Sequence, residues 1–179
     1  MGRNGITRCA LLSAVGCLLL GAANIPDPFD GKASARVFVF ARTDCPITNR
    51  YAPELQRIAA EFAKRDVQFW LVYPDPDETD SGIAAHTREY NLPGKALRDP
   101  RHELARRAHA TISPQAAVFD KNGQLVYSGR IDDRYVDFGK ARPAPTTHDL
   151  ELAIADTLAG KPVTQARTRA VGCYLSDVQ

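Results

Sequence analysis

Residues 38–49 read FVFARTDCPITN, and the expected architecture of the chain follows from them. The apolar residues 35–41 predict a buried strand, and apolar positions at helical spacing predict an amphipathic helix over residues 49–65. Cys45 lies at the turn between the two, where the N–H groups and the dipole of a helix N-terminus stabilise a thiolate. Because the thiolate is the reactive form of cysteine, the stretch predicts an exposed, redox-active thiol.

Charged neighbours bear on that thiolate. Arg42 and Arg50 are candidates to stabilise it, whereas Asp44 opposes them, so the sequence alone leaves the direction of the pKa shift open. The alternative interpretation of Cys45 is an inert cysteine, either a small buried hydrophobe or half of a structural disulfide. We favour the reactive interpretation because the strand-to-helix turn, the neighbouring arginine and Pro46 occur together.

Strands and helices alternate on the C-terminal side of this turn. The predicted strands are residues 35–41, 67–73, 115–120 and 124–130, and the predicted helices are residues 49–65, 80–90, 100–110 and 147–159. The Asn-Gly pair between the last two strands is typical of a β-hairpin, and residues 132–145 are expected to form an irregular loop. The order predicts an α/β fold whose central mixed sheet combines a parallel βαβ unit with a C-terminal hairpin, flanked by helices.

The N-terminal segment, residues 1–23, has the pattern of a secretory signal peptide. Arg3 and Arg8 precede the apolar residues 10–20, and small residues follow as a cleavage site. The run is too short for a stable membrane span, so we expect an exported protein, periplasmic or secreted. The alternatives are a tether by the uncleaved segment and, less favoured because apolar residues follow it, lipidation at Cys17.

Cleavage would leave a linker over residues 24–34, a domain over 35–160 and a tail over 161–179. The whole chain has 23 basic and 21 acidic side chains, and the segment removed carries two arginines and no acid. The remaining chain is therefore balanced in charge. This balance of charge gives no indication of binding to nucleic acid or to an anionic membrane.

The cysteine count also changes with cleavage. Cys9 and Cys17 leave with the signal segment, so Cys45 and Cys173 remain. A single nucleophilic thiol that becomes oxidised needs a second thiol to regenerate it, and Cys173 is then the candidate resolving thiol. A static disulfide between the two, which would fasten the tail to the domain, is an equal alternative.

These features resemble the thioredoxin-like redoxins, the group that includes exported thiol-disulfide oxidoreductases and the alkyl hydroperoxide reductase/thiol-specific antioxidant proteins. The similarity covers about residues 35–160. It rests on a strand that ends in Thr-Asp-Cys-Pro, on Ile-Ser-Pro before the hairpin and on the closing helix. The resemblance implies a thioredoxin-like fold in which Thr43, Asp44, Pro46 and Pro114 frame the cysteine, with Pro114 in the cis form.

Three positions depart from the patterns within this group. Thr48 stands where a dithiol thioredoxin has its second cysteine, so local dithiol chemistry is not expected. Arg42 stands where a peroxiredoxin has threonine, with Thr43 one place away. Ala41 stands where copper chaperones of the Sco type carry another cysteine.

We therefore predict an exported thiol-disulfide oxidoreductase in which Cys45 is the nucleophile and Cys173 resolves. Its substrates would be protein or small-molecule disulfides and thiols, with no cofactor and no metal. A peroxiredoxin-like thiol peroxidase is the first alternative. The second is a non-enzymatic Sco-like module that binds copper through Cys45, Cys173 and His148. Residues 130–138 are interpreted as a rim over the cysteine or as a solvated loop.

Overall fold

The computed structural model describes residue 1 and residues 27–175. The signal peptide prediction, with Cys9 and Cys17, lies outside these residues. Among the helices described, none combines the length and apolar character that crossing a membrane requires.

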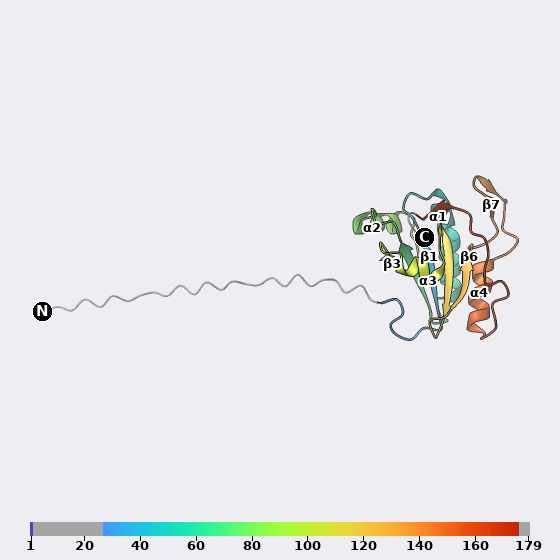
Figure 1. Ribbon diagram of the computed structural model, residues 1–179, viewed down its shortest axis with the longest axis horizontal. Helices are drawn as coiled ribbons and strands as arrows, with labels where there is room; N and C mark the ends of the chain where they lie inside the picture. The colour runs from blue at the N-terminus through green and yellow to red at the C-terminus, as the bar shows by residue number, and fades with distance from the viewer. Residues whose placement is uncertain (2–26, 176–179) are drawn as a thin grey trace.

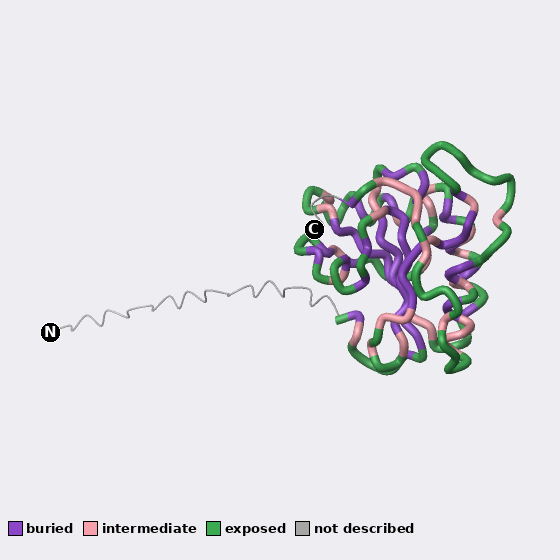
Figure 2. Tube along the Cα trace, turned by 45° about the vertical axis from the view of Figure 1, so that its right-hand side comes forward, coloured by how far each residue is buried: buried purple, intermediate pink, exposed green. Residues whose placement is uncertain are grey.

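A five-stranded sheet forms the centre of the molecule (Figures 1 and 2). Its strands run in the order β3-β2-β1-β5-β6. Their bounds are Ala35–Phe40 for β1, Val67–Tyr73 for β2, Lys95–Arg98 for β3, Gln115–Asp120 for β5 and Leu125–Gly129 for β6. β1 pairs with β2 and β2 with β3 in parallel, whereas β1 with β5 and β5 with β6 are antiparallel. This arrangement confirms the predicted mixed sheet, to which β3 is an unpredicted addition.

Within residues 27–175, four helices flank the sheet (Figure 1). They are α1 (Pro46–Phe62), α2 (Asp80–Glu89), α3 (Glu103–Ala108) and α4 (Asp149–Leu158). Apolar residues of α1 and α4 share one core cluster with Val37 and Val39, and α3 shares a second with Phe38 and Phe40. Because successive strand residues point to opposite faces, these clusters lie on the two sides of the sheet.

Two helix starts differ from the prediction by three residues. α1 begins at Pro46, three residues early, because proline fits the first helical position, where its missing N–H costs nothing. α3 begins late, at Glu103, because the Asp99 carboxylate accepts hydrogen bonds from the N–H groups of Glu103 and Ala105, at 2.8 and 2.9 Å. His102, which precedes Glu103, has a φ of 57° and is the N-cap residue outside the helix.

The described part of the expected linker is packed against the domain. The Phe29 ring lies 5.4 Å from the Phe38 ring and 5.2 Å from the Phe119 ring, centroid to centroid. The Arg36 guanidinium donates hydrogen bonds to the carbonyls of Pro28 and Gly31, at 3.1 and 2.7 Å. Residues 27–34 therefore belong to the folded unit, which corrects the linker interpretation for this part.

The C-terminal tail returns to the part of the domain beside Cys45, beyond the carboxyl end of the central strand β1, and forms a separate two-stranded sheet there. β9 (Cys173–Tyr174) pairs antiparallel with β4 (Ile112–Ser113), and the Leu175 N–H donates to the Thr111 carbonyl at 2.9 Å. The loop expected to be irregular contains a small hairpin of β7 (Tyr135–Asp137) and β8 (Lys140–Ala141), which projects from the body of the molecule (Figure 1).

Candidate redox site

Cys45 occupies the predicted turn between β1 and α1, but its side chain is buried. It is the N-cap residue of α1 and has 0% exposure. The Cys45 Sγ donates a hydrogen bond to the Ser113 carbonyl oxygen at 3.0 Å. The expectation of an exposed thiolate is therefore wrong for this state of the protein. The reason is the β4–β9 pair, which brings Ser113 and Cys173 against the sulfur.

Cys173 lies beside Cys45. The register of β9 on β4 places Cys173 opposite Ser113, whose carbonyl accepts the hydrogen bond of the Cys45 thiol, so the two cysteines are neighbours in space. Both thiols are free, and Cys173 is partly exposed. The sequence left open whether the tail reaches Cys45, and the structure brings the two cysteines together.

The surroundings shift the pKa values of the two thiols in opposite directions. Burial raises the pKa of Cys45, but hydrogen bonds from Cys173 and from the N–H and hydroxyl of Thr48 outweigh burial, so the pKa lies below its ordinary value. In the thiol form Cys45 makes no capping bond to α1. The Ser113 carbonyl accepts a hydrogen bond from that thiol form. Burial and the neighbouring Cys45 raise the pKa of Cys173 to about 12. Cys45 is therefore the thiol that ionises first.

Thr48 and Ser113 are site residues that sequence reasoning missed. The hydroxyls of Thr48 and Ser113 are hydrogen-bonded at 2.9 Å, and both residues are fully buried. The sequence pattern marks Thr48 only as the position where a second cysteine is absent. Its place in the first turn of a helix that follows a cysteine was the signal that could have identified it, because N–H groups in that turn point at the N-cap side chain.

Arg42 contacts the tail and nearby acids. Its guanidinium pairs with Asp44 at 3.0 Å and with Asp75 at 3.5 Å, and it donates to the Tyr174 carbonyl at 3.2 Å. The Asp44 bond raises the pKa of Arg42, and Arg42 lowers that of Asp44. Arg42 is thus placed to hold β9, and its positive charge offsets a small part of the rise in the pKa of Cys173. Arg50 is exposed on α1.

The remaining predicted residues surround the turn. The Thr43 N–H donates to the Glu78 carboxylate at 2.6 Å, which fixes the backbone before Cys45. Pro46 is exposed at the start of α1. Pro114 is buried, and the Ser113–Pro114 peptide is cis, as predicted. The carbonyl that meets the Cys45 sulfur belongs to this same peptide.

His148 does not join the cysteines. It is the N-cap residue of α4, and its Nδ1 lies 3.6 Å from a Glu54 carboxylate oxygen. Within residues 27–175, the His, Cys and acidic side chains close enough together to share one ion are Glu54, Asp132 and His148. The alternative metal set of Cys45, Cys173 and His148 is therefore corrected: its members do not converge.

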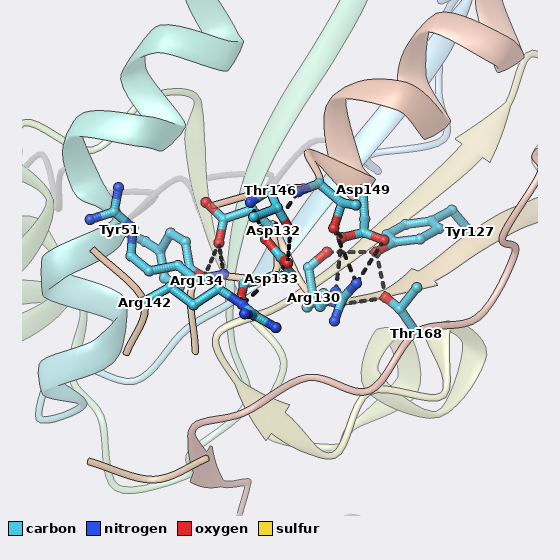
Figure 3. Close-up of polar contacts among 11 residues, drawn as sticks. Tyr51, Tyr127, Arg130, Asp132, Asp133, Arg134, Arg142, Thr146, Asp149 and Thr168 are labelled. Atoms are coloured by element: carbon cyan, nitrogen blue, oxygen red, sulfur yellow. Dashed lines mark hydrogen bonds and ion pairs between the residues drawn. The ribbon is translucent and has the colours of Figure 1, made fainter. Parts of the chain in front are cut away.

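The loop after β6 has a buried base and an exposed tip that borders a cleft beside Cys173. Asp132 and Asp133 are buried in a polar network that includes Tyr51 and Thr146 (Figure 3). The tip of the loop, at Asp137 and Phe138, lines a cleft of about 670 Å³ together with Cys173 and Tyr174. The loop tip thus lies at the tail, whereas its base packs into the domain.

Comparison with known proteins identifies the family of the chain. The model of the AhpC/TSA family matches residues 28–128, which include Cys45 and Pro114. The chain belongs to the AhpC/TSA family. This redoxin has the thioredoxin-like fold of its structural neighbours, and a general redox role follows from the family. Cys173 lies outside the matched residues.

Solved structures with the same fold come from several bacteria. An uncharacterized conserved protein from Geobacillus kaustophilus is 24% identical, with a TM-score of 0.69 over 80% of this chain and 77% of that chain. A hypothetical protein from Sinorhizobium meliloti is also 24% identical, with a TM-score of 0.66 over 80% and 79%. A thiol:disulfide interchange protein of the thioredoxin family from Chlorobium tepidum is 16% identical, with a TM-score of 0.52 over 71% and 81%. A comparison with curated proteins gave no match.

Proposed function

We propose that this redoxin is an exported thiol-disulfide oxidoreductase in which Cys45 is the nucleophile and Cys173 the resolving thiol. The observation that carries the proposal is the meeting of the two free thiols at the β4–β9 pair. Residues 1–23 would act as the export signal, residues 35–160 as the redox domain, and residues 161–179 as the tail that supplies the second thiol.

The reaction follows from the different acidities of the thiols. The Cys45 thiolate attacks one sulfur of a substrate disulfide, the substrate S–S bond breaks, and the first substrate thiolate leaves with a proton from solvent. The Cys173 thiol loses its proton and attacks the Cys45 sulfur of the mixed disulfide. A Cys45–Cys173 disulfide forms and the second substrate thiol leaves. The substrate gains two electrons and the protein loses two, so an external thiol reductant must complete the cycle.

The buried state of Cys45 requires the tail to move for a disulfide to reach it. Arg42 and the β4–β9 hydrogen bonds hold the tail, and a pair of two-residue strands is weak enough to open. The cleft beside Cys173, with the exposed side chains of Phe138 and Tyr174 at its edge, is where we place the substrate. The Ser113–Pro114 backbone would then face the substrate at the sulfur.

A thiol peroxidase is the second candidate, and the full burial of Cys45 favours it, because a peroxide needs far less space than a disulfide. The Cys45 thiolate would attack one peroxide oxygen, the O–O bond would break, and an alcohol or water would leave. The resulting sulfenic acid would condense with the Cys173 thiol to give the same disulfide and a molecule of water.

Parallel assays separate the two activities. The reduced full chain is given a thiol reductant with insulin as the disulfide substrate in one assay and hydrogen peroxide in the other. The proposal expects insulin reduction that is lost in Cys45→Ser and retained in the control Cys9→Ser/Cys17→Ser. Peroxide consumption without insulin reduction would establish the peroxidase instead. Equal rates for Cys45→Ser and the unchanged chain in both assays would exclude both.

A further inference from the structure

Asp132 is a buried carboxylate with one oxygen that has no partner. Its residue exposure is 2%. Oδ1 accepts hydrogen bonds from the Tyr51 hydroxyl at 2.5 Å and from the Arg134 N–H at 2.9 Å, whereas Oδ2 is buried without a hydrogen bond (Figure 3). No ion pair within residues 27–175 includes Asp132. Buried carboxylates are normally paired or bound to a metal, so the unpartnered oxygen points to a site that can bind a cation.

Two further metal-ligating side chains lie next to Asp132. One ligand atom from each of Glu54, Asp132 and His148 lies within 4.8 Å of the other two. The three residues come from α1, from the loop after β6 and from the start of α4. The His148 imidazole does not cap its own helix, so it is available as a ligand.

We propose that Glu54, Asp132 and His148 bind one divalent transition-metal ion of the zinc class. An imidazole nitrogen with two carboxylate oxygens suits zinc and its neighbours, whereas calcium and magnesium prefer oxygen ligands alone. Water would complete the coordination. The site lies about 14 Å along α1 from Cys45 at 1.5 Å per residue, so it is separate from the thiols and does not depend on the proposed redox function.

The geometry allows the three ligands to close on an ion. Ligand atoms around a tetrahedral zinc ion lie about 3.4 Å apart, so they must approach one another from their present positions. Asp132 would stay in place, because the Tyr51 hydroxyl and the Arg134 N–H hold its other oxygen. Glu54 and His148 are partly exposed side chains with room to turn toward it.

Arg57 competes for one of the ligands. Its guanidinium donates to both oxygens of Glu54, at 3.0 and 2.7 Å, and pairs also with Glu151. The Arg57 side chain is 45% exposed, and exposed ion pairs contribute little to stability. A bound divalent ion would therefore displace Arg57 from Glu54 at low cost, and Arg57 would keep Glu151 as its partner.

Zinc titration of the full chain tests this site. All four cysteines are first replaced by serine, so that no thiol binds the metal, and binding is followed by calorimetry. One zinc ion per chain is expected to bind at this site. His148→Ala and Glu54→Gln in the same background should each weaken that binding about tenfold or more. His109→Ala, which removes an exposed histidine elsewhere, is the matched control and should leave the affinity unchanged.

Thermal unfolding supplies a second readout that also reports whether each variant folds. Zinc should raise the melting temperature of the cysteine-free chain and of His109→Ala, because an ion that binds the native state stabilises that state against unfolding. The melting temperature of His148→Ala should not respond. No zinc binding by the cysteine-free chain, or equal affinity in folded His148→Ala, would overturn the proposal.

Discussion

Cys173 stands opposite Ser113 in the β4–β9 pair, and the Ser113 carbonyl accepts the hydrogen bond of the Cys45 thiol. One residue thus links the two cysteines. The approach is close because Gly172 precedes Cys173: a Cβ built on Gly172 would lie 2.0 Å from the Ser113 carbonyl oxygen. The residues around Cys173 therefore determine where the tail packs. Substitutions at these positions should move Cys173 away from Cys45.

Gly172→Ala should displace the tail. The added methyl cannot fit against the Ser113 backbone, and overpacking of this kind typically costs about 1–3 kcal/mol. We expect Cys45 to react faster with an alkylating reagent at a pH where it is fully ionised. Gly82→Ala in α2, where the nearest atom is the Thr79 hydroxyl oxygen at 3.2 Å, is the control. An unchanged limiting rate in Gly172→Ala would mean that the tail does not cover the sulfur.

The acidity of Cys45 should depend on Cys173. The pKa of Cys45 is expected below the value of about 8.5 for a free thiol, and Cys173→Ala should raise it by removing a hydrogen bond to the thiolate. The thiolate therefore persists to lower pH in the unchanged chain. The ultraviolet absorbance of the thiolate, taken as the difference from Cys45→Ser, measures both values. A pKa that stays the same in Cys173→Ala would contradict the coupling.

Asp133 should stabilise the fold only while it is ionised. Hydrogen bonds from Thr146 and Thr147, with Arg142 nearby, lower its pKa in the folded protein. Its contribution is therefore complete above its unfolded pKa of about 3.9 and is lost as the pH falls through the folded value. Asp133→Asn should lower the free energy of unfolding at pH 7 by about 1–3 kcal/mol.

Urea unfolding at neutral and acid pH measures the Asp133 effect. The difference between Asp133→Asn and the unchanged chain should shrink as the pH falls below about 3.9. Asp137→Asn, at an exposed position in the same loop, should have little effect at either pH. If Asp133→Asn lowered the free energy of unfolding equally at neutral and acid pH, the effect would come from the change in side-chain structure and not from the lost charge.

Phe29→Ala tests whether the segment before β1 belongs to the folded unit. Phe29 packs on Phe38 and Phe119, and the Arg107 guanidinium lies 3.7 Å from the centre of its ring. Its removal should lower the free energy of unfolding by about 2 kcal/mol, the contribution of one largely buried aromatic side chain. Phe138→Ala, at a side chain that is 65% exposed, is the control. Equal stability of both variants would restore the linker interpretation.

The strands of the sheet centre were predictable because their hydrophobic pattern is local. β1, β2 and β5 consist mainly of buried apolar residues, and their predicted bounds agree with the structure to within one residue. β3 reads Lys-Ala-Leu-Arg and has no such pattern. It forms because the edge of β2 offers hydrogen bonds to it, and only the folded sheet reveals that edge.

The site was predictable only where it is local. Cys45 at a strand-to-helix turn and the cis form at Pro114 followed from the sequence and the resemblance. The β4–β9 pair is two residues long and joins segments far apart in the chain, so no periodic sequence pattern predicts it. For the same reason neither the burial of Cys45 nor the cluster of Glu54, Asp132 and His148 could be read from residue spacing.

A single turnover followed by peptide mapping tests the Cys45–Cys173 pair most directly. The reduced chain is mixed with one equivalent of a peptide disulfide, quenched with acid and digested. We expect a Cys45–Cys173 disulfide in the unchanged chain and, in Cys173→Ser, a mixed disulfide that stops at Cys45. Release of substrate thiol by Cys45→Ser at the rate of the unchanged chain, or a free Cys173 thiol after turnover of the unchanged chain, would contradict the account.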